Sequence, residues 1–353
     1  MSSYQINGIQ QIGLGVEDAE EAWAWYRKAF GMNVPIFRDH ATASLMTRYT
    51  GDQAHQRYAI LAMNLEGGAG LEIWQYTSRK PQDIAKKILM GDTGVTAVKI
   101  KARSVDAAYK DLKQKDVNLL SEPVTGPDGR RHFYLEDPYS NLIEVIESSS
   151  WFQHRKKNLG GVAGCVVGVT DIDKALPLYR DILGFKELVY DKSQQFDDFS
   201  NLPGGKYAFR RVLLRSSSFR MGAFGRLLGQ HEIELVQVKD RQPEKIFRNR
   251  WWGDKGYIHV CFDVSNMDDL ATTCRKAGFE FTVDSRNSFD MGKAAGHFAY
   301  CEDPDGTLVE LVETHKIPIV EKAGWYLNLK KRDASKPLPN WILKLLSLNS
   351  VRD

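Results

Sequence analysis

Two segments far apart in this chain end in nearly the same way. Residues 136–144 read EDPYSNLIE, and residues 302–310 read EDPDGTLVE. Each segment predicts the end of one strand, a turn initiated by Pro, and an apolar strand that carries one internal Glu. Because a carboxylate among apolar inward-facing residues costs free energy unless something binds it, the repetition indicates either metal ligation or a shared structural device.

Four stretches share a broader pattern, in which a short apolar strand leads into a helix. The first of these helices opens with the capping-box sequence D-x-x-E at residues 18–21 and stops at Gly31. Further strands follow each helix, and the last strand of each stretch carries an internal Glu. These residues are Glu72, Glu144, Glu234 and Glu310. The pattern predicts an α+β fold made of four βαβββ units.

The four units are related in pairs. Nearly the same sequence offset separates Glu72 from Glu234, Ala97 from His259, and Glu144 from Glu310. We therefore predict that units one and two form a domain, residues 1–150, which is duplicated by units three and four, residues 151–316. Residues 317–353 leave the repeat and contain a short amphipathic helix, whose apolar face we expect to pack on its own domain.

The composition is that of a globular protein. At 353 residues the chain is long enough for two cores, and its net charge of +3 does not favour nucleic acid as a partner. No apolar run approaches the ~20 residues that span a bilayer, and the start of the chain lacks a signal-peptide pattern. The four cysteines form no CxxC pair, which predicts buried free thiols in a reducing compartment and favours the cytoplasm.

One local basic run is the exception to the balanced charge. Its members either face solvent or bind an anionic small molecule. They are Arg210, Arg211, Arg215, Arg220 and Arg226.

The E-D-P-D-G-x-x-x-E ending, together with helices that read WYRKAFGM and LYRDILGF, resembles the vicinal oxygen chelate superfamily. This superfamily includes glyoxalase I, bleomycin-resistance proteins, methylmalonyl-CoA epimerase and extradiol dioxygenases, and the resemblance covers about residues 8–315. It implies that two βαβββ units pair so that their open mixed sheets curl into a half-barrel, or cup, around a metal ion, with the helices outside. It also implies that the ligands come from the first and last strands of each unit.

Transferred position by position, the resemblance assigns candidate ligands to both halves of the chain. The first-strand positions are Gln11, Ala97, Gly164 and His259, and the last-strand positions are Glu72, Glu144, Glu234 and Glu310. With consecutive units paired, the C-terminal cup would hold Glu234, His259 and Glu310 around a divalent Zn, Ni, Co, Mn or Fe ion.

The N-terminal cup would hold Gln11, Glu72 and Glu144. An amide and two carboxylates can accept a hard cation, but a neutral amide is a poorer donor than imidazole. This cup is predicted to be a weaker site or a vestigial one.

Several aromatic side chains are candidates for the substrate pocket. His132 and Tyr134 precede the first Asp-Pro turn, and His297 and Tyr300 precede the second, so these four either line the cups or pack within the strands. Tyr257 shares a strand face with His259 and belongs to the same group of candidates.

Two further segments are candidates for the mouth of a pocket. Trp251 and Trp252 either wall the mouth or straddle an edge strand. Residues 288–292 and 294–296 form a Gly-containing loop that would suit a mobile lid over the second cup.

The resemblance favours a metal-dependent glyoxalase-like enzyme that binds two adjacent oxygens of a small molecule and stabilises an enediolate, in isomerase, epimerase or lyase chemistry. Glu234 or Glu310 would move the proton between carbons. One alternative is an extradiol dioxygenase, whose familiar arrangement needs His where Gly164 stands. Another is a metal-free small-molecule binder of the bleomycin-resistance type, which the gaps at Ala97 and Gly164 suit. We expect a small-molecule substrate, which the basic run allows to be anionic, no nucleic acid or membrane partner, and a monomer or homodimer.

Overall fold

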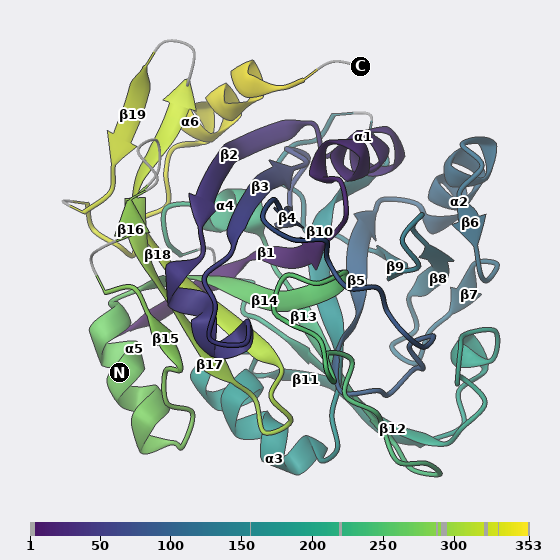
Figure 1. The fold of residues 1–353 in the computed structure, drawn as a ribbon. Coiled ribbons are helices and arrows are strands. Elements are labelled where there is room, and N and C mark those ends of the chain that lie inside the picture. The colour runs from purple at the N-terminus through teal and green to yellow at the C-terminus, as the bar shows by residue number, and fades with distance from the viewer. Residues whose placement is uncertain are drawn as a thin grey trace.

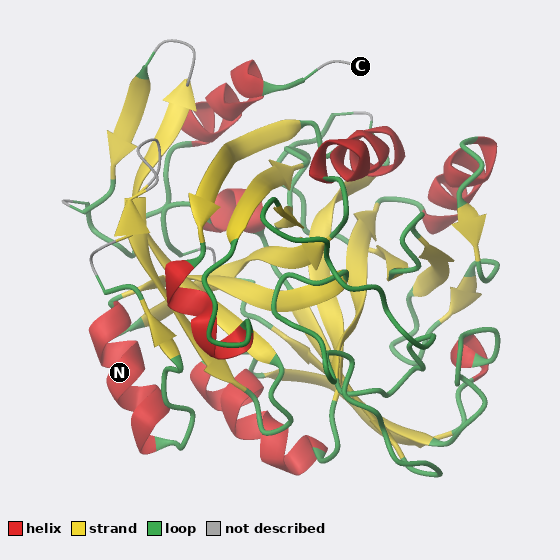
Figure 2. Cartoon of the chain, in the orientation of Figure 1, coloured by secondary structure: helices red, strands yellow, loops and turns green. Residues whose placement is uncertain are grey.

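Helices lie around the outside of two large sheets in the computed structural model of the chain (Figures 1 and 2). The structure describes residues 4–155, 157–218, 221–286, 289–290, 295–320, 324–330 and 332–351. The predicted α+β class and the four βαβββ units are confirmed, with the first strand after the helix split into two short pieces in units two and four.

The elements follow the repeat closely. Unit one consists of β1 (Gln5–Gly15), α1 (Ala19–Phe30), β2 (Val34–Thr42), η1 (Ser44–Tyr49), β3 (Gln56–Met63) and β4 (Gly70–Tyr76). Unit two consists of β5 (Gly94–Ala102), α2 (Val105–Gln114), β6 (Asn118–Leu119), β7 (Val124–Thr125), β8 (Arg131–Glu136) and β9 (Leu142–Glu147). Unit three consists of β10 (Leu159–Gly168), α3 (Ile172–Leu176), η2 (Pro177–Ile182), β11 (Glu187–Gln194), η3 (Asp197–Phe199), β12 (Phe209–Arg215), α4 (Gly225–Leu228) and β13 (Glu232–Val238). Unit four consists of β14 (Gly256–Ser265), α5 (Met267–Lys276), β15 (Val283–Asp284), β16 (Phe289–Asp290), β17 (Ala295–Glu302) and β18 (Leu308–Val320).

Local sequence explains where the first helix begins and ends. The Asp18 side chain accepts hydrogen bonds from the backbone N–H groups of Glu20 and Glu21, both at 2.9 Å, and so caps the start of α1. Gly31 follows the last helical residue with a φ of 67°, the left-handed conformation that glycine adopts most readily. Asp171 caps α3 in the same way, which agrees with the predicted repeat.

The two sheets join the units in an order that differs from the prediction. The ten-stranded sheet runs β15-β17-β18-β14-β1-β4-β3-β2, with β16 beside β17 and the tail strand β19 (Trp325–Asn328) beside β18, so it combines unit one with unit four. The nine-stranded sheet runs β11-β12-β13-β10-β5-β9-β8-β6, with β7 beside β8, so it combines unit two with unit three. In Figure 1 the purple β1 accordingly lies beside the green β14. The prediction that unit one pairs with unit two, and unit three with unit four, is therefore wrong, and each half of the chain contributes to both sheets.

The repeated Asp-Pro turn connects the two sheets. Asp137 accepts hydrogen bonds from the backbone N–H groups of Tyr139 and Asn141, and from the hydroxyl of Tyr26 in α1 at 2.6 Å. Because Tyr26 belongs to unit one and Asp137 to unit two, this contact ties the ten-stranded sheet to the nine-stranded sheet. The second copy repeats the device, since the hydroxyl of Tyr179 in unit three donates to Asp303 in unit four at 3.0 Å. The Asp of the repeated ending thus has the structural role that the sequence left open.

The C-terminal tail packs on both halves of the chain, whereas its own domain alone was expected to cover it. It consists of β19 (Trp325–Asn328), α6 (Asn340–Leu345) and η5 (Leu346–Asn349), and β19 extends the ten-stranded sheet beside β18. Ile342 and Leu343 of α6 are buried in one cluster with Ile317 and Ile319 of β18. Trp341 remains 59% exposed, so only part of the apolar face is covered.

The cysteines also match the prediction, since all four are buried and free. A search of the helices in the described ranges finds none whose length and apolar character would allow it to cross a membrane. The predicted domain boundary near residues 148–150 lies in the connection between β9 and β10, and the domain limits themselves stay a prediction.

We predict that Tyr179→Phe destabilises the protein by about 1–3 kcal/mol, because the buried Asp303 carboxylate loses a hydrogen-bond donor that nothing replaces. Urea unfolding of the purified variant measures this change. Tyr207→Phe is the matched control, since Tyr207 is 36% exposed and its hydroxyl can be hydrated. Equal unfolding midpoints for the two variants would contradict the structural role of the Asp-Pro turn.

Candidate metal centre

The central strand pair of the ten-stranded sheet positions two of the candidate ligands. In the antiparallel register of β1 and β14, Gln11 lies opposite Cys261 and Gly13 lies opposite His259. Gly13 makes room for the imidazole, because a Cβ atom there would lie 2.4 Å from Cε1 of His259. Opposed residues, and residues two apart along a strand, share one face of a sheet, so Gln11 and His259 project from the same face.

The flanking strands add two carboxylates to this face. β4 runs parallel to β1 and places Glu72 beside Gly13, while β18 runs parallel to β14 and places Glu310 beside Cys261. Two neighbouring rows of residues therefore cross the strands on this face. One row is Glu72, Gly13 and His259, and the other is Gln11, Cys261 and Glu310. The four candidates are Gln11, Glu72, His259 and Glu310.

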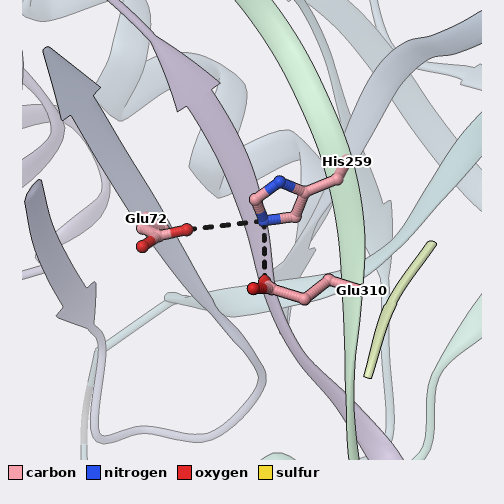
Figure 3. A group of neighbouring side chains, drawn as sticks. All are labelled: Glu72, His259 and Glu310. Carbon is pink, nitrogen blue, oxygen red and sulfur yellow. Dashed lines mark ion pairs between the residues drawn. The ribbon is translucent and has the colours of Figure 1, made fainter. Parts of the chain in front are cut away.

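The side chains of Glu72, His259 and Glu310 converge on one point (Figure 3). Nε2 of His259 lies 3.0 Å from Oε2 of Glu310 and 3.4 Å from Oε2 of Glu72. The amide nitrogen of Gln11 lies 3.2 Å from the same Glu72 oxygen and 3.4 Å from the same Glu310 oxygen. One ligand atom from each of Glu72, His259 and Glu310 lies within 4.8 Å of the others.

This donor set fits a divalent metal ion. Oε1 of Gln11 is buried and has no hydrogen-bond partner among the described residues. Nε2 of His259 faces the carboxylates of both Glu310 and Glu72. Buried polar atoms are rarely left without partners, so the unpaired amide oxygen beside two converging carboxylates indicates a group that they bind. Two carboxylates would neutralise the charge of a dication, and a nitrogen with several oxygens is a donor set that Zn, Ni, Co, Mn and Fe accept.

The charges of the cluster shift the pKa values of its members. Burial alone would lower the pKa of His259, but the carboxylates of Glu310 and Glu72 outweigh it and raise that pKa to about 9. Burial would raise the pKa of Glu310, but the facing imidazolium lowers it below its ordinary value. In the metal-free protein a proton on His259 thus takes over part of the role of a cation.

A cavity of about 390 Å³ opens above the cluster and is lined by Gln11, Glu72 and Glu310. Trp252 and Tyr300 also line it, and the hydroxyl of Tyr300 lies 3.4 Å from Nδ1 of His259. Trp252 and Tyr300 thus lie on the wall of this cavity, and their contact with a substrate stays a prediction.

The nine-stranded sheet has a face that corresponds, residue by residue, to the face that carries the four candidate ligands. This corresponding face carries a lysine. In the registers of β10, β5, β13 and β9, Ala97 stands at the position of His259, Gly164 at that of Gln11, and Lys99 at that of Cys261. Nζ of Lys99 lies 2.6 Å from Glu144 and 2.8 Å from Glu234, the two carboxylates that correspond to Glu310 and Glu72.

Further ion pairs fill this second cup. Arg211 donates to Glu234 at 2.6 Å and to Asp198 at 2.7 Å, and Tyr190 donates to Glu234 at 2.6 Å. Burial would raise the pKa of Glu234, but Arg211 and Lys99 lower it to about 2. The space that remains is about 10 Å³, roughly the minimum that one water molecule needs. The second cup therefore has no room for a substrate.

The predicted ligand sets are corrected accordingly. Glu234, expected beside His259 and Glu310, lies in the other sheet with Lys99 and Arg211. Glu144, expected beside Gln11 and Glu72, lies there too. One cup combines the last-strand carboxylates of units one and four, and the other combines those of units two and three. The predicted positions therefore exchange partners, while their strands stay as predicted.

Three predicted pocket residues lie away from the metal cluster. Nδ1 of His132 contacts Glu144 at 2.6 Å in the second cup, and Nε2 of His297 contacts Asp284 at 2.6 Å. The hydroxyl of Tyr257 donates to the backbone carbonyl of Leu142 at 3.1 Å. None of the three lines the 390 Å³ cavity. Of the predicted lid, residues 288, 291, 292 and 294 lie outside the described residues.

Sequence reasoning missed the resident cations of the second cup. Lys99 lies two residues after Ala97 in an apolar alternating strand, so the sequence places it on the same inward face. A lysine on an inward face needs a charged partner, and this requirement could have predicted the ion pairs of the second cup. Arg211 lies in the basic run, and that pattern alone does not predict its burial.

The fold and the site define a protein built from paired βαβββ units with one metal-competent cup. The sequence profile of the Glyoxalase/Bleomycin resistance protein/Dioxygenase superfamily matches residues 8–145 and 161–311. The chain belongs to this superfamily.

Individual relatives are distant. The chain is 23% identical over 323 residues to a lactoylglutathione lyase of Schizosaccharomyces pombe, a match that covers 89% of this chain and 97% of the relative. Glyoxalase I from Zea mays superposes with a TM-score of 0.55 at 14% identity, covering 88% of this chain and 92% of the maize chain. A point mutant of the maize protein superposes with a TM-score of 0.56 at 15% identity. At such identity the solved structures establish the fold alone.

We predict that Lys99→Met destabilises the protein by about 3–5 kcal/mol, because the buried carboxylates of Glu144 and Glu234 lose the ammonium between them. Lys110→Met, at an exposed position of α2, should change stability by less than about 0.5 kcal/mol. Urea unfolding compares the two variants, and a Lys99→Met midpoint equal to that of the control would refute the role of Lys99.

We also predict a pH dependence of the metal-free protein. Because the folded-state pKa of His259 is raised to about 9, its stabilising contribution is complete below about pH 6.5 and is lost as pH rises through 9. The loss should amount to roughly 3 kcal/mol in unfolding experiments with chelator present. His259→Gln should abolish this part of the slope, and an unchanged slope in the variant would contradict the assignment.

Proposed function

We propose that this chain is a metal-dependent enzyme of the glyoxalase type, which moves a proton between adjacent carbons of a small molecule bearing two neighbouring oxygens. The reaction class is isomerisation, epimerisation or lyase chemistry. The observation that supports this proposal most strongly is the convergence of four donors from units one and four beneath a cavity of about 390 Å³. Membership of the superfamily and similarity to a lactoylglutathione lyase agree with it.

Gln11, Glu72, His259 and Glu310 are the residues that would hold the ion. When bound, a divalent ion supplies Lewis-acid chemistry to the substrate oxygens. Gln11 and His259 hold the floor of the site from the central strands β1 and β14. Trp74, Trp252 and Phe298 line the cavity and exclude water from the reacting atoms.

The proton transfer falls to the two carboxylates. Glu72 and Glu310 approach from β4 and β18, the strands on either side of the central pair, so either can take a proton from a carbon and return it to the neighbouring one. In the metal-free protein the imidazolium of His259 lowers the pKa of Glu310, so this carboxyl is ionised at neutral pH, as a base must be. A bound dication would favour the ionised carboxylate for the same electrostatic reason. Glu234, the other base suggested by the sequence, accepts from Lys99, Arg211 and Tyr190 and takes no part in the proposed step.

Metal analysis of protein purified without chelator tests the proposal. We expect about one transition-metal equivalent per chain. We expect His259→Ala to lose it, because the imidazole is the one nitrogen ligand among the four candidates, and Gln11 would bind through its amide oxygen. Glu310→Gln should bind the metal at least about tenfold more weakly, since an amide replaces a charged donor.

His132→Gln is the matched control, because His132 is the histidine of the second cup. It should leave the metal content unchanged. Protein that takes up no ion on reconstitution with Zn, Ni, Co, Mn or Fe, yet binds a small aromatic molecule, would contradict the enzyme and favour a metal-free binder. Two equivalents per chain would contradict the division into one active and one filled cup.

A further inference from the structure

The walls of the metal cavity are mainly apolar. Ile36 and Met63 come from unit one, Leu227 and Leu228 from α4 of unit three, and Ile317 and Leu346 from β18 and the C-terminal tail. These six side chains belong to one hydrophobic cluster, in which Ile36 packs against the buried members. A ligand whose oxygens reach the four donors would therefore place the rest of its body against aliphatic side chains.

The described lining offers little to a negatively charged ligand. Its only cation is Arg57, which lies 3.1 Å from the Asp39 carboxylate and donates to the Asp39 carbonyl at 2.8 Å. The charges of Glu72 and Glu310 already balance a divalent ion, so the floor of the cavity adds no net positive charge. Taking a carboxylate from water into such surroundings would cost free energy that no contact repays.

The described arginines of the basic run do not line the metal cavity, and Arg220 lies outside the described residues. Arg210 pairs with Asp173 and Asp191, and Arg211 pairs with Glu234 and Asp198. Neither arginine lines the metal cavity. The basic run left open an anionic substrate. These two guanidinium groups, however, already pair with carboxylates outside the metal cavity.

Part of the apolar wall lies outside the region that the chain shares with the superfamily profile. The match ends at residue 311, whereas Ile317 and Leu346 follow it. The extended β18 and the packed tail thus supply part of the cavity wall from residues that the profile does not cover.

We infer that the substrate of this site is an uncharged molecule with two adjacent oxygens on an apolar body, aliphatic or aromatic, rather than a molecule with anionic groups such as a peptide conjugate. This inference rests on the proposed function, since it takes the metal centre as the anchor. An apolar cavity of about 150 Å³ holds a benzene molecule, so about 390 Å³ accommodates a body larger than a single ring.

Hydroxamates test the inference, because they present two adjacent oxygens to a metal and their tails can be varied. Calorimetry of the zinc-loaded protein would compare acetohydroxamate, hexanohydroxamate and the monohydroxamate of adipic acid, which replaces the terminal methyl of hexanohydroxamate with a carboxylate. Each methylene that is buried should strengthen binding by up to about fourfold (about 0.8 kcal/mol). We expect hexanohydroxamate to bind at least tenfold more tightly than acetohydroxamate, and the adipic compound to lose most of that gain.

A pair of surface substitutions sharpens the comparison. Leu45 lines the cavity and is 43% exposed, so Leu45→Arg can add a cation at the mouth without disturbing the core. It should lower the ratio of the dissociation constant of the adipic compound to that of hexanohydroxamate by at least threefold. Leu188→Arg, at a 58% exposed position on β11 of the other sheet, should leave the preference unchanged.

The outcomes distinguish a failure of the inferred substrate class from a failure of the proposed metal-dependent function. If acetohydroxamate binds but the apolar tail adds nothing, or the carboxylate tail binds more tightly, the inferred substrate class is overturned and the metal centre stands. If no hydroxamate binds the zinc-loaded protein, the proposed function fails, and the inference built on it is overturned with it.

Discussion

The antiparallel pairing of β1 with β14 is the contact on which the candidate metal centre depends. Unit one alone offers an amide and a carboxylate, and unit four alone offers an imidazole and a carboxylate. Neither pair is a metal site, and the four donors meet only because the first strand of the first unit adds to the first strand of the last. Closing so long a loop costs entropy, but units two and three fold into a sheet of their own, which shortens the flexible path between the strands.

The two cups show how few residues separate a metal site from a filled one. Where the first cup has Gly13 opposite His259, the second has Val166 opposite Ala97, so the imidazole is gone and a larger side chain stands in its space. Both cups keep two carboxylates, and both must neutralise them. The first cup leaves a position for a dication, whereas the second uses the ammonium of Lys99 together with a guanidinium. The buried carboxylates can thus be neutralised in both cups, but only the first cup keeps a cavity large enough for a small molecule.

Much of this arrangement could be predicted from the sequence. The strand and helix periodicities predicted the four units correctly. The repeated Glu positions predicted the right strands for all four carboxylates, because a carboxylate in an apolar strand is costly unless a cation or a hydrogen-bond donor binds it. The partners of those carboxylates could not be predicted in this way. A sequence offset shows which units are copies of each other, but units one and two could pair with each other or with units four and three while burying the same apolar faces. Only the register of β1 with β14 distinguishes these possibilities, and it depends on long-range contacts such as Gly13 with His259.

Anomalous X-ray diffraction from crystals of the zinc-loaded protein measures the central claim most directly. The account predicts one strong peak, about 2.0–2.2 Å from His259 Nε2 and from oxygens of Glu72 and Glu310, with ligands from the first and last units around the same ion. A peak beside Glu144 and Glu234 in the nine-stranded sheet, or crystals of loaded protein with no peak near His259, would contradict it.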